Sequence, residues 1–441
     1  MAKKKGPLAS PFVPAEEQPY PIPENWCWTY LTGFAECLDS FRRPINATER
    51  IGRNGNIPYY GATGQVGWID DFLTNEQLVL VGEDGAPFLD RMKDKAYMIE
   101  GKAWVNNHAH ILRSYYGSAG NFYLLNYLNC FDYTGYVNGT TRLKLTQSSM
   151  NTIPVPVAPI SEQHRIVARI ESLFAKLDEA KEKAQAVVDG FELRKSAILH
   201  KAFTGELTQR WRKENGVGLD SWKKTDIESI ADVKGGKRIP KGMSLTTDNT
   251  GHPYIKAGNL KLGTVLDEGI MFVPDDVLQY IKNYTVTAGD VYITNVGACI
   301  GDCGIIPDKY DGANLTENAV KITNLKCNGQ FLAWYISSNG VQQRIKNLIA
   351  SATLGKLSIA NIKTISVSLP TIEEQAEIVC ILEELQSKEQ QAKEAAEFVL
   401  TQIDAMKKAI LARAFRGELG TNDPAEEWAG ELVKKLISDG A

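Results

Sequence analysis

The sequence lacks the features that would place a protein in a membrane or in an oxidising compartment. No run approaches the roughly 18 apolar residues of a membrane-spanning helix, and the charged start MAKKKGPLASPFVP has no apolar signal-peptide core. The 7 cysteines include no Cys-x-x-Cys pair, so reduced thiols are expected rather than disulfides or a zinc site. We therefore expect a cytoplasmic protein without membrane contact.

Positive charge is also scarce, which argues against nucleic-acid binding at first sight. The net charge is −4, whereas domains that bind nucleic acids are usually basic. The acidic residues are concentrated, however. Residues 373–441 contain 15 acidic and 8 basic side chains, a balance of −7, so the remaining residues carry +3. A modest basic surface outside that segment is compatible with this distribution.

No catalytic motif is complete. The Asn-Ile-Pro-Tyr of residues 56–59 departs from the Asn-Pro-Pro-Tyr of amino-methyltransferases, and no glycine-rich motif for S-adenosylmethionine accompanies it. The Gly-Gly-Lys-Arg of residues 235–238 lacks the spacing of a phosphate-binding loop. Asp90 with Glu100 and Lys102 fits a nuclease pattern that is too short to be informative, and the 5 histidines show no metal-ligand spacing. We expect no catalytic and no metal site.

One long segment occurs twice. Residues 153–207 align with residues 365–419 at an offset of 212 without a gap, and 24 of the 55 pairs are identical. Apolar residues recur at alternating steps of four and three, which is typical of a coiled coil. Gly190 weakens the first predicted helix, and Glu389 interrupts the apolar row of the second. The residues predicted to pack between the helices are Ile166, Ile170, Leu173, Leu177, Val187 and Phe191 with Ile378, Leu382, Leu385, Val399, Ile403 and Ile410.

The segments that precede the two helices share a frame but differ in detail. Each opens near a tryptophan, Trp26 or Trp222, and Phe122 lies opposite Phe331 in a short helical pattern. Just before each long helix, Thr-Arg-Leu-Lys-Leu at 141–145 faces Thr-Leu-Gly-Lys-Leu at 353–357. We predict an α+β protein in which two mixed α/β globular domains are joined by two long antiparallel coiled-coil helices, as a pseudo-two-fold internal repeat. The predicted divisions are a disordered tail 1–19, domain 20–157, helical region 158–215, domain 216–369, helical region 370–420 and an acidic tail 421–441.

Glycine-rich loops with basic and polar residues are the candidates for DNA contacts, because Arg and Lys pair with guanine and Asn with adenine. Ordinary polar loops are the alternative interpretation, but two variable domains on one repeated frame suit a protein that reads two half-sites. We expect Lys144 and Lys356 to contact phosphates, with a pairing to a nearby carboxylate as the alternative. The candidates are Arg42, Arg43, Arg53, Thr141, Lys144, Lys237, Arg238, Lys256, Asn259, Thr353 and Lys356.

The repeated motifs resemble those of one family. They are the proline-containing segment followed by Glu-Gln (159–163 and 370–375), Lys-x-Ala-Ile-Leu (195–199 and 407–411) and Ala-Phe-x-Gly-Glu-Leu (202–207 and 414–419). Over residues 20–420 the chain resembles the specificity subunit of a type I restriction–modification system. The resemblance implies two target recognition domains that read a bipartite asymmetric site in double-stranded DNA, and helices that act as a ruler.

The same resemblance implies partners and places the chemistry in them. Two modification (M) subunits would bind S-adenosylmethionine and methylate adenine, and restriction (R) subunits would use ATP and Mg, so this chain would need no cofactor. A related two-subunit system and a methylation-only system remain open. A coiled-coil scaffold without DNA binding, or a self-sufficient methyltransferase, are the alternatives from other classes.

Overall fold

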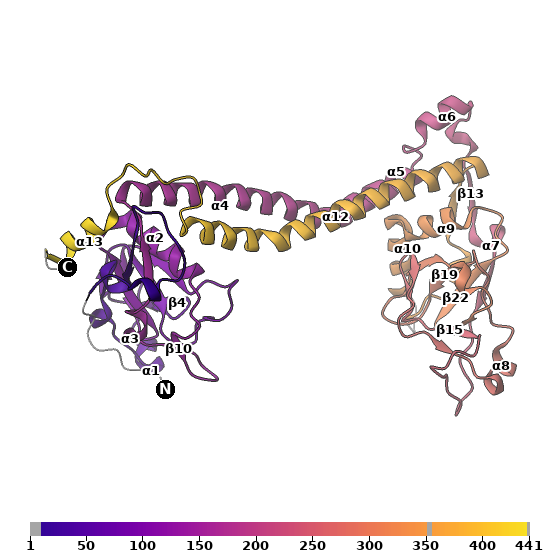
Figure 1. Ribbon diagram of the computed structural model, residues 1–441. Coiled ribbons are helices and arrows are strands. Elements are labelled where there is room, and N and C mark those ends of the chain that lie inside the picture. Colours follow the sequence, from indigo (N-terminus) through magenta and orange to yellow (C-terminus); the bar gives the residue numbers. More distant parts are fainter. Residues whose placement is uncertain (1–9, 351–354, 439–441) are drawn as a thin grey trace. The chain divides into compact units, whose positions relative to one another are not determined.

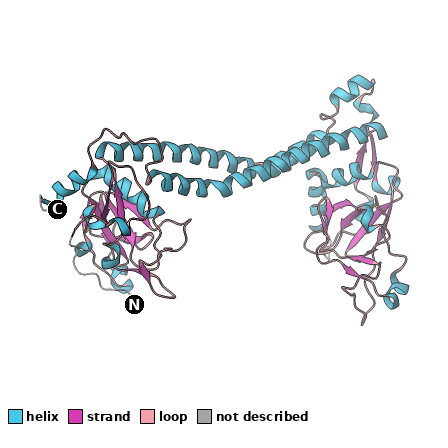
Figure 2. Ribbon diagram, viewed as in Figure 1, coloured by secondary structure: helices cyan, strands magenta, loops and turns pink. Residues whose placement is uncertain are grey.

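The computed structural model describes residues 10–350 and 355–438 (Figure 1). The chain divides into two compact units, one of residues 1–185 with 397–441 and one of residues 186–396. Each unit combines a mixed domain of strands and short helices with paired long helices (Figure 2). This confirms the predicted α+β class with two mixed domains. No helix among the described residues is long and apolar enough to cross a membrane.

A four-stranded antiparallel sheet forms the centre of the first domain. Strand β6 is buried along its whole length, because Val79 and Val81 enter a core shared with helix α2 while Leu78 and Leu80 enter a core on the opposite face. A strand buried on both faces shows a continuous apolar run rather than alternation. In sheet order the strands are β2 (Ala35–Cys37), β9 (Ala109–Ser114), β6 (Leu78–Gly82) and β7 (Ala96–Ile99), and α2 spans Gly117–Cys130.

A second sheet lies on the outer face of the first, where Ala103 and Val105 join the core of Leu78 and Leu80. Its order is β4-β3-β8-β5, and the β3–β8 pair is parallel. The strands are β3 (Ile57–Gly61), β4 (Gly64–Ile69), β5 (Thr74–Asn75) and β8 (Lys102–Val105). Short elements complete the domain: α1 (Ala47–Ile51), α3 (Gln147–Met150), β10 (Val137–Asn138) and β11 (Lys144–Leu145), with 3₁₀ turns Ala15–Glu17, Leu31–Gly33 and Asp39–Phe41.

The second domain repeats this topology. Its main sheet is β14 (Asp232–Gly235), β22 (Ala319–Thr323), β19 (Val291–Thr294) and β20 (Cys303–Ile305). Its other sheet is β18 (Met271–Phe272), β15 (Pro253–Ile255) and β21 (Asn314–Leu315), and again one pair, β15–β21, is parallel. The remaining elements are α7 (Ile227–Ile230), α8 (Asp275–Ile281), α9 (Gly329–Ser337), α10 (Asn339–Ala350), α11 (Ile359–Lys363), β16 (Leu260–Lys261), β17 (Thr264–Val265) and 3₁₀ turns Leu219–Ser221 and Asp308–Tyr310. The shared frame predicted from sequence is confirmed.

The first and last strands of each domain pair with each other beside the long helices. Strand β1 (Cys27–Tyr30) pairs antiparallel with β12 (Pro154–Val157), and β13 (Lys223–Asp226) pairs in the same way with β23 (Ser366–Leu369). Each domain therefore returns its chain to the point where it began. This closure places the start of the next long helix directly after the last strand of the domain.

Aligned phenylalanines of the repeat make matching contacts in the two units. The ring of Phe415 lies 5.0 Å from that of Tyr123 and 5.1 Å from that of Tyr127. The ring of Phe203 lies 5.6 Å from that of Phe331 and 5.1 Å from that of Tyr335. Tyr123, rather than Phe122, is therefore the counterpart of Phe331, so the alignment made from sequence was wrong by one residue at this helix.

The long helices run antiparallel within each unit, as predicted. In the first unit Lys407 Nζ lies 2.6 Å from Asp178 Oδ1, and in the second Arg194 Nε lies 2.7 Å from Glu389 Oε2. As residue numbers rise along one helix of the pair they fall along the other. The helices are α4 (Ile160–Asp189), α5 (Phe191–Phe203), α6 (Gln209–Asn215), α13 (Ala429–Ser438) and the 43-residue α12 (Ile372–Ala414), which contributes to both units.

The two irregularities in the repeated sequence belong to one ion pair. The first helix is interrupted at Gly190, where a Cβ atom would lie 2.4 Å from the guanidinium of Arg194. That guanidinium passes over the glycine, donates to the Val187 carbonyl at 2.8 Å and reaches Glu389. Gly190 leaves room for the Arg194 guanidinium, and Glu389 interrupts the apolar row because it has this cationic partner.

The predicted packing residues are mostly correct, with one error in the second half of α12. Ile166, Ile170, Phe191, Ile378, Leu382 and Ile403 are buried, and Leu173, Leu177, Val187, Leu385 and Ile410 are half-buried. Val399 is 41% exposed, so its predicted packing role is wrong. The contact row runs instead through Lys393, Ala396, Leu400, Ile403 and Lys407. Both lysines lie over rings of the facing helix, Phe191 at 4.8 Å and Phe174 at 5.1 Å, because long side chains cover apolar surface with their stems.

Both segments predicted to be tails are ordered where the structure describes them. In the N-terminal segment Val13 is buried and Glu17 accepts a hydrogen bond from the Tyr30 hydroxyl at 2.9 Å. In the C-terminal segment α13 buries Val433, and Glu426 accepts two hydrogen bonds of 2.9 Å from Arg165. Residues 10–19 and 421–438 are thus parts of the first unit, and the prediction of a disordered tail is corrected for residues 10–19.

A buried glutamate joins each domain to its long helix. The Trp26 indole donates to Glu162 at 2.7 Å, and the Trp222 indole donates to Glu374 at 2.9 Å. Both glutamates are fully buried and are aligned in the repeat. Because a buried carboxylate needs hydrogen bonds, these contacts fix the start of each domain against the helix that follows it.

Candidate nucleic-acid interface

The Lys-Leu pairs that end the Thr-x-x-Lys-Leu motifs occupy equivalent places in the two domains. Leu145 and Leu357 are fully buried, and their backbone amides donate to the carbonyls of Glu83 at 2.7 Å and Asn295 at 3.0 Å. The lysine before each leucine is exposed as a consequence. The equivalence predicted for Lys144 and Lys356 is therefore confirmed, while their contact with DNA stays a prediction. Thr141 is exposed at the start of its loop, and Thr353 lies outside the described residues.

The two lysines differ in their partners. Lys144 Nζ lies 2.9 Å from Glu83 Oε1, and the hydrogen bond that this half-exposed lysine donates to Glu83 raises its pKa. The equivalent of Glu83 in the second domain is the uncharged Asn295. Lys356 has no carboxylate partner among the described residues. A phosphate would have to compete with Glu83 for Lys144 but not for Lys356.

Arg42 is part of an ion-pair network rather than a free cation. Its side chain is 16% exposed, pairs with Glu83, lies 2.9 Å from Asp39 and donates to the Ala109 carbonyl at 3.2 Å. His110 Nδ1 lies 2.6 Å from Asp39. Burial raises the pKa of Asp39, but His110, the Ile111 amide and Arg42 together outweigh it, and the net shift is downward. Burial likewise raises the pKa of Glu83, while Lys144 and Arg42 lower it by more.

This network also explains the one group of potential metal ligands within residues 10–350 and 355–438. One ligand atom from each of Asp39, Glu83 and His110 lies within 4.8 Å of the others. Arg42 and Lys144 already neutralise the two carboxylates at those positions. The arrangement is therefore that of a salt-bridge cluster.

The remaining candidates of the first domain are Arg53 and Arg43. The Arg53 guanidinium lies 4.6 Å above the Trp104 ring and 2.6 Å from Asp70. Arg43 is exposed, and its backbone is held by Val105 and by the Trp104 indole, which donates to the Arg43 carbonyl at 2.8 Å. Trp104 thus contacts both arginines.

In the second domain a glycine sets the geometry of the Lys237–Arg238 loop. A Cβ atom at Gly236 would lie 2.0 Å from the Thr316 carbonyl oxygen, so only glycine fits this close approach. The Lys237 side chain extends over the Tyr284 ring at 5.4 Å, and Arg238 lies 2.5 Å from Glu317. Both basic side chains are exposed next to the backbone that holds the loop.

Asn259 has an internal role that removes it from the set of base-reading candidates. It is 3% exposed. Its Oδ1 accepts from the Lys256 amide at 3.1 Å, and its Nδ2 donates to the carbonyls of Leu266 at 3.3 Å and Glu268 at 3.0 Å. The side chain therefore closes the loop and has no face left for a base. Lys256 is half-buried beside it and stays a candidate.

Sequence reasoning missed two basic residues that lie with the candidates. Arg142 is 61% exposed and lies 2.9 Å from Asp84, and it belongs to the Thr-Arg-Leu-Lys-Leu loop itself, which was the available signal. Lys102, on the inner strand β8, lies over the ring of Phe72 at 4.7 Å, and the edge strand β4 of the same sheet exposes Trp68. Aromatic residues beside cations are common where proteins contact nucleic acids.

Comparison with known proteins identifies the family. The Type I restriction modification DNA specificity domain matches residues 23–188 and 220–397, that is, once in each half of the chain. A putative type I restriction enzyme specificity subunit from Haemophilus influenzae is 26% identical over 378 residues, covering 82% of this chain and 87% of the relative. The EcoKI specificity subunit of Escherichia coli is 26% identical over 298 residues, covering 63% of this chain and 60% of the relative.

Solved structures show the same fold. The HsdS subunit from Thermoanaerobacter tengcongensis superposes with a TM-score of 0.63 at 16% identity, covering 91% of this chain and 99% of that chain. A chain from a structural description of complex assembly and conformational transition in a type I R-M system gives a TM-score of 0.61, also at 16% identity, covering 91% of this chain and all of that chain. The protein belongs to the type I restriction–modification DNA specificity family, as a sequence-specific DNA recognition subunit without catalytic activity of its own that carries the family domain twice.

Proposed function

We propose that each domain reads one half of a bipartite, asymmetric site in double-stranded DNA. The observation that carries this proposal is a repeated strand order that presents different side chains in the two domains. Lys144 pairs with Glu83, whereas the position equivalent to Glu83 in the second domain is the uncharged Asn295. Two domains with the same strand order but different exposed side chains suit two different half-sites. A coiled-coil scaffold would have no need for divergent end domains.

The chemistry belongs to partner subunits in this proposal. Two M subunits bind S-adenosylmethionine and methylate adenine, R subunits use ATP and Mg, and this chain binds no cofactor. A methylation-only system, or a related system with two kinds of subunit, would use the same recognition chain. Purification of the complex from the native host, with its subunits identified by mass spectrometry, distinguishes these arrangements.

We further propose that the long helices act as a ruler for the spacer between the half-sites. Helix α12 enters both units without interruption over 43 residues. An α-helix rises about 1.5 Å per residue. The number of residues in the helix therefore sets the distance between the two recognition domains that it joins. The proposal makes spacer length a property of the helices and half-site sequence a property of the domains.

An exchange of one domain tests the proposal. Residues 216–369 are replaced by the corresponding domain of a relative, and methylated adenines are mapped in host DNA with the parent and the hybrid chain. One half of the methylated site should change and the other half, with the spacer, should stay. A change in both halves, or in neither, would show that the domains do not read DNA independently.

A further inference from the structure

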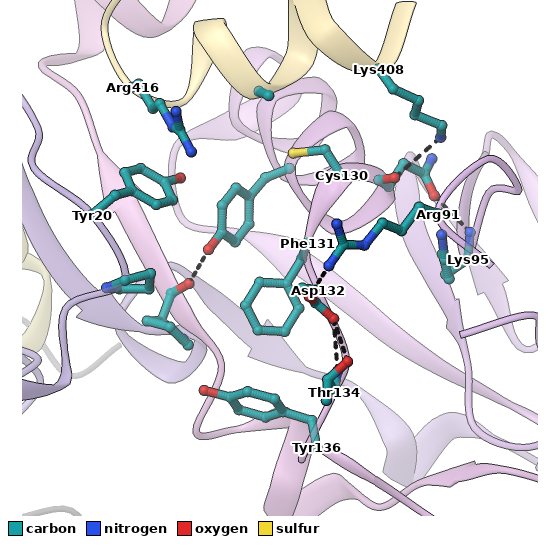
Figure 3. Close-up of a pocket in the computed structure, with 15 residues that line it drawn as sticks. Tyr20, Arg91, Lys95, Cys130, Phe131, Asp132, Thr134, Tyr136, Lys408 and Arg416 are labelled. Atoms are coloured by element: carbon teal, nitrogen blue, oxygen red, sulfur yellow. Dashed lines mark hydrogen bonds and ion pairs between the residues drawn. The ribbon is translucent and has the colours of Figure 1, made fainter. Parts of the chain in front are cut away.

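The first unit contains a cavity of about 620 Å³ where the end of α12 meets the domain. Lys408, Ala412 and Arg416 line it from α12 and the residues just after it, and Tyr127 and Pro154 line it from α2 and β12. Figure 3 shows Lys408 and Arg416 extending from the long-helix side toward the domain. The cavity is wide enough for a group of side chains, since ligand pockets typically measure about 300–1,000 Å³.

The second unit contains a cavity of about 350 Å³ in the equivalent place. Ser196, His200 and Thr204 line it from α5 and the residue after it, and Tyr335 and Ser366 line it from α9 and β23. The repeat offset of 212 aligns these three helix residues with Lys408, Ala412 and Arg416, and Ser366 with Pro154. The two cavities are therefore copies of one feature.

The first cavity is rich in positive charge. Arg91, Lys95, Lys408 and Arg416 line it. Asp132 is the only carboxylate in the lining and pairs with Arg91 at 2.8 Å, and Asp94, outside the lining, pairs with Lys408 at 2.7 Å. Arg416 is exposed and has no carboxylate partner among the described residues. Burial, and after it the neighbouring Lys408 ammonium, lowers the pKa of Lys95, although Asp90 and Asp94 act in the opposite direction.

Aromatic side chains form the other wall of the first cavity. The Arg416 guanidinium lies 5.1 Å from the centre of the Tyr20 ring, and Phe131 and Tyr136 lie opposite α12 (Figure 3). The Phe131 ring lies 5.0 Å from the Tyr136 ring at an edge-to-face angle of 73°. The cavity thus offers cations and aromatic surface side by side.

The second cavity repeats the charge bias with fewer aromatic groups. Lys224 and Arg344 line it together with His200, and no Asp or Glu does. Both basic side chains are exposed and lack a carboxylate partner among the described residues. The whole chain has 53 acidic against 49 basic residues, so two basic cavities at equivalent positions do not follow from average composition.

We propose that each cavity receives an acidic segment of the methyltransferase (M) subunit, and that two M copies insert the same segment into the two cavities. The inference rests on the proposed function, which supplies two copies of one partner. Identical partner chains offer identical segments to sites related by internal symmetry, and carboxylates pair with Arg in geometrically specific hydrogen bonds. Two separate cavities suit side chains of a peptide, whereas a DNA backbone follows a continuous groove.

Charge reversal tests the inference with variants that leave no buried partner unpaired. The full-length chain carrying Arg416→Glu or Arg344→Glu is mixed with the purified M subunit, without DNA, and the stoichiometry is measured by native mass spectrometry over a dilution series. Each variant should lose one M copy, with the dissociation constant for that copy raised by about tenfold or more. The double variant should lose both.

Matched controls make the same charge change outside the cavities. Lys181→Glu on α4 in the first unit and Lys346→Glu on α10, two residues from Arg344, alter exposed lysines that line neither cavity. Both should bind two M copies with unchanged affinity. Thermal unfolding of all variants is compared with the parent chain, so that a loss of M binding in a stably folded variant is assigned to the cavity.

Photo-crosslinking tests whether the two cavities take the same segment. A benzoylphenylalanine is introduced at Ala412 or at His200, the complex with M is irradiated, and crosslinked peptides are sequenced. The same Asp/Glu-containing peptide of M from both positions supports the inference. Different peptides, peptides without acidic residues, or two M copies retained by the double variant would overturn it.

The outcomes also separate this inference from the proposed function. A parent chain that binds no M subunit contradicts the proposed function itself. Normal M binding combined with weaker DNA binding by Arg416→Glu and Arg344→Glu would assign the cavities to DNA phosphates and overturn the docking inference alone.

Discussion

Replacement of Arg212 by methionine should release the second domain from its long helix. The Arg212 Nη1 atom lies 2.6 Å from Glu374 Oε1, and the two side chains are 9% and 0% exposed. Arg212 also donates to the Thr208 hydroxyl at 2.9 Å and to the Gly205 carbonyl at 2.5 Å. The substitution keeps an unbranched chain in the same space but leaves Glu374 buried without its cation.

The expected cost follows from breaking a buried ion pair on one side only, which is about 3–5 kcal/mol. Glu374 would keep the hydrogen bonds from Thr208 at 2.7 Å and Trp222 at 2.9 Å, which places the loss toward the lower end. A loss of about 3 kcal/mol raises the fraction of opened second units by roughly a hundredfold, since each 1.4 kcal/mol is a factor of ten. Replacing both partners, as in Arg212→Met with Glu374→Gln, should recover much of this loss, because no buried charge then remains.

Hydrogen exchange measured by mass spectrometry is the suitable assay, since it reports each unit separately while a global melt of two units does not. Peptides of the second domain should exchange faster in Arg212→Met, and peptides of the first domain should not change. The double variant completes a mutant cycle. A loss below about 1 kcal/mol, or no recovery in the double variant, would refute the assignment of Arg212 as the charge partner that holds Glu374.

The other predictions concern DNA contact, pH and spacer length. Lys356→Ala should weaken binding to all DNA sequences and lower the slope of log affinity against log salt concentration by about one. Lys144→Ala should lower this slope less, because Lys144 is already paired with Glu83. Equal slopes in the two variants would contradict a role for that pairing. The folded-state pKa values of Asp39 and Glu83 lie below their unfolded values, so the stability they add is present above about pH 5 and is lost as the pH falls through the folded values. Glu83→Gln should therefore flatten the acid-unfolding curve, and an unchanged steepness would refute this linkage. Deletion of residues 184–187 shortens a helix by about 6 Å, which is close to two base-pair steps of roughly 3.4 Å. In a methylation assay on substrates with graded spacers, methylation should either stop or favour a spacer shorter by one to two base pairs. Activity on the original spacer would refute the ruler.

The sequence was sufficient for the architecture because the repeat is long and gapless. Positions such as Ile166 and Ile378 are apolar in both copies, and burial follows directly from that pattern. The error at Val399 has a physical cause. Lys393 and Lys407 lie at contact positions of α12 and were excluded as charged, although their stems cover Phe191 and Phe174. A binary apolar pattern cannot register a lysine that packs with its methylene groups.

The candidate interface was less predictable, since residue type does not reveal what a side chain already binds. Arg42 and Asn259 were chosen for donors that suit DNA, yet the structure shows these donors used within the domain. Lys144 and Lys356 share a motif, and only the residue across the fold, Glu83 or Asn295, distinguishes them. That residue is far away in sequence, so the motif alone gives the position of a cation and not its availability.

The C-terminal segment shows how a structural repeat can continue after the sequence repeat has ended. Glu162 and Glu374 are identical and equally buried, but their donors differ. Glu374 is held by Thr208 and Arg212, whereas Glu162 accepts hydrogen bonds from Asn422 at 2.9 Å and Thr421 at 3.3 Å. A buried carboxylate requires donors rather than particular residues, so the segment after α12 could diverge from the segment after α5 while completing the same site. The end of the chain is therefore part of the first unit for the same physical reason that residues 208–212 are part of the second.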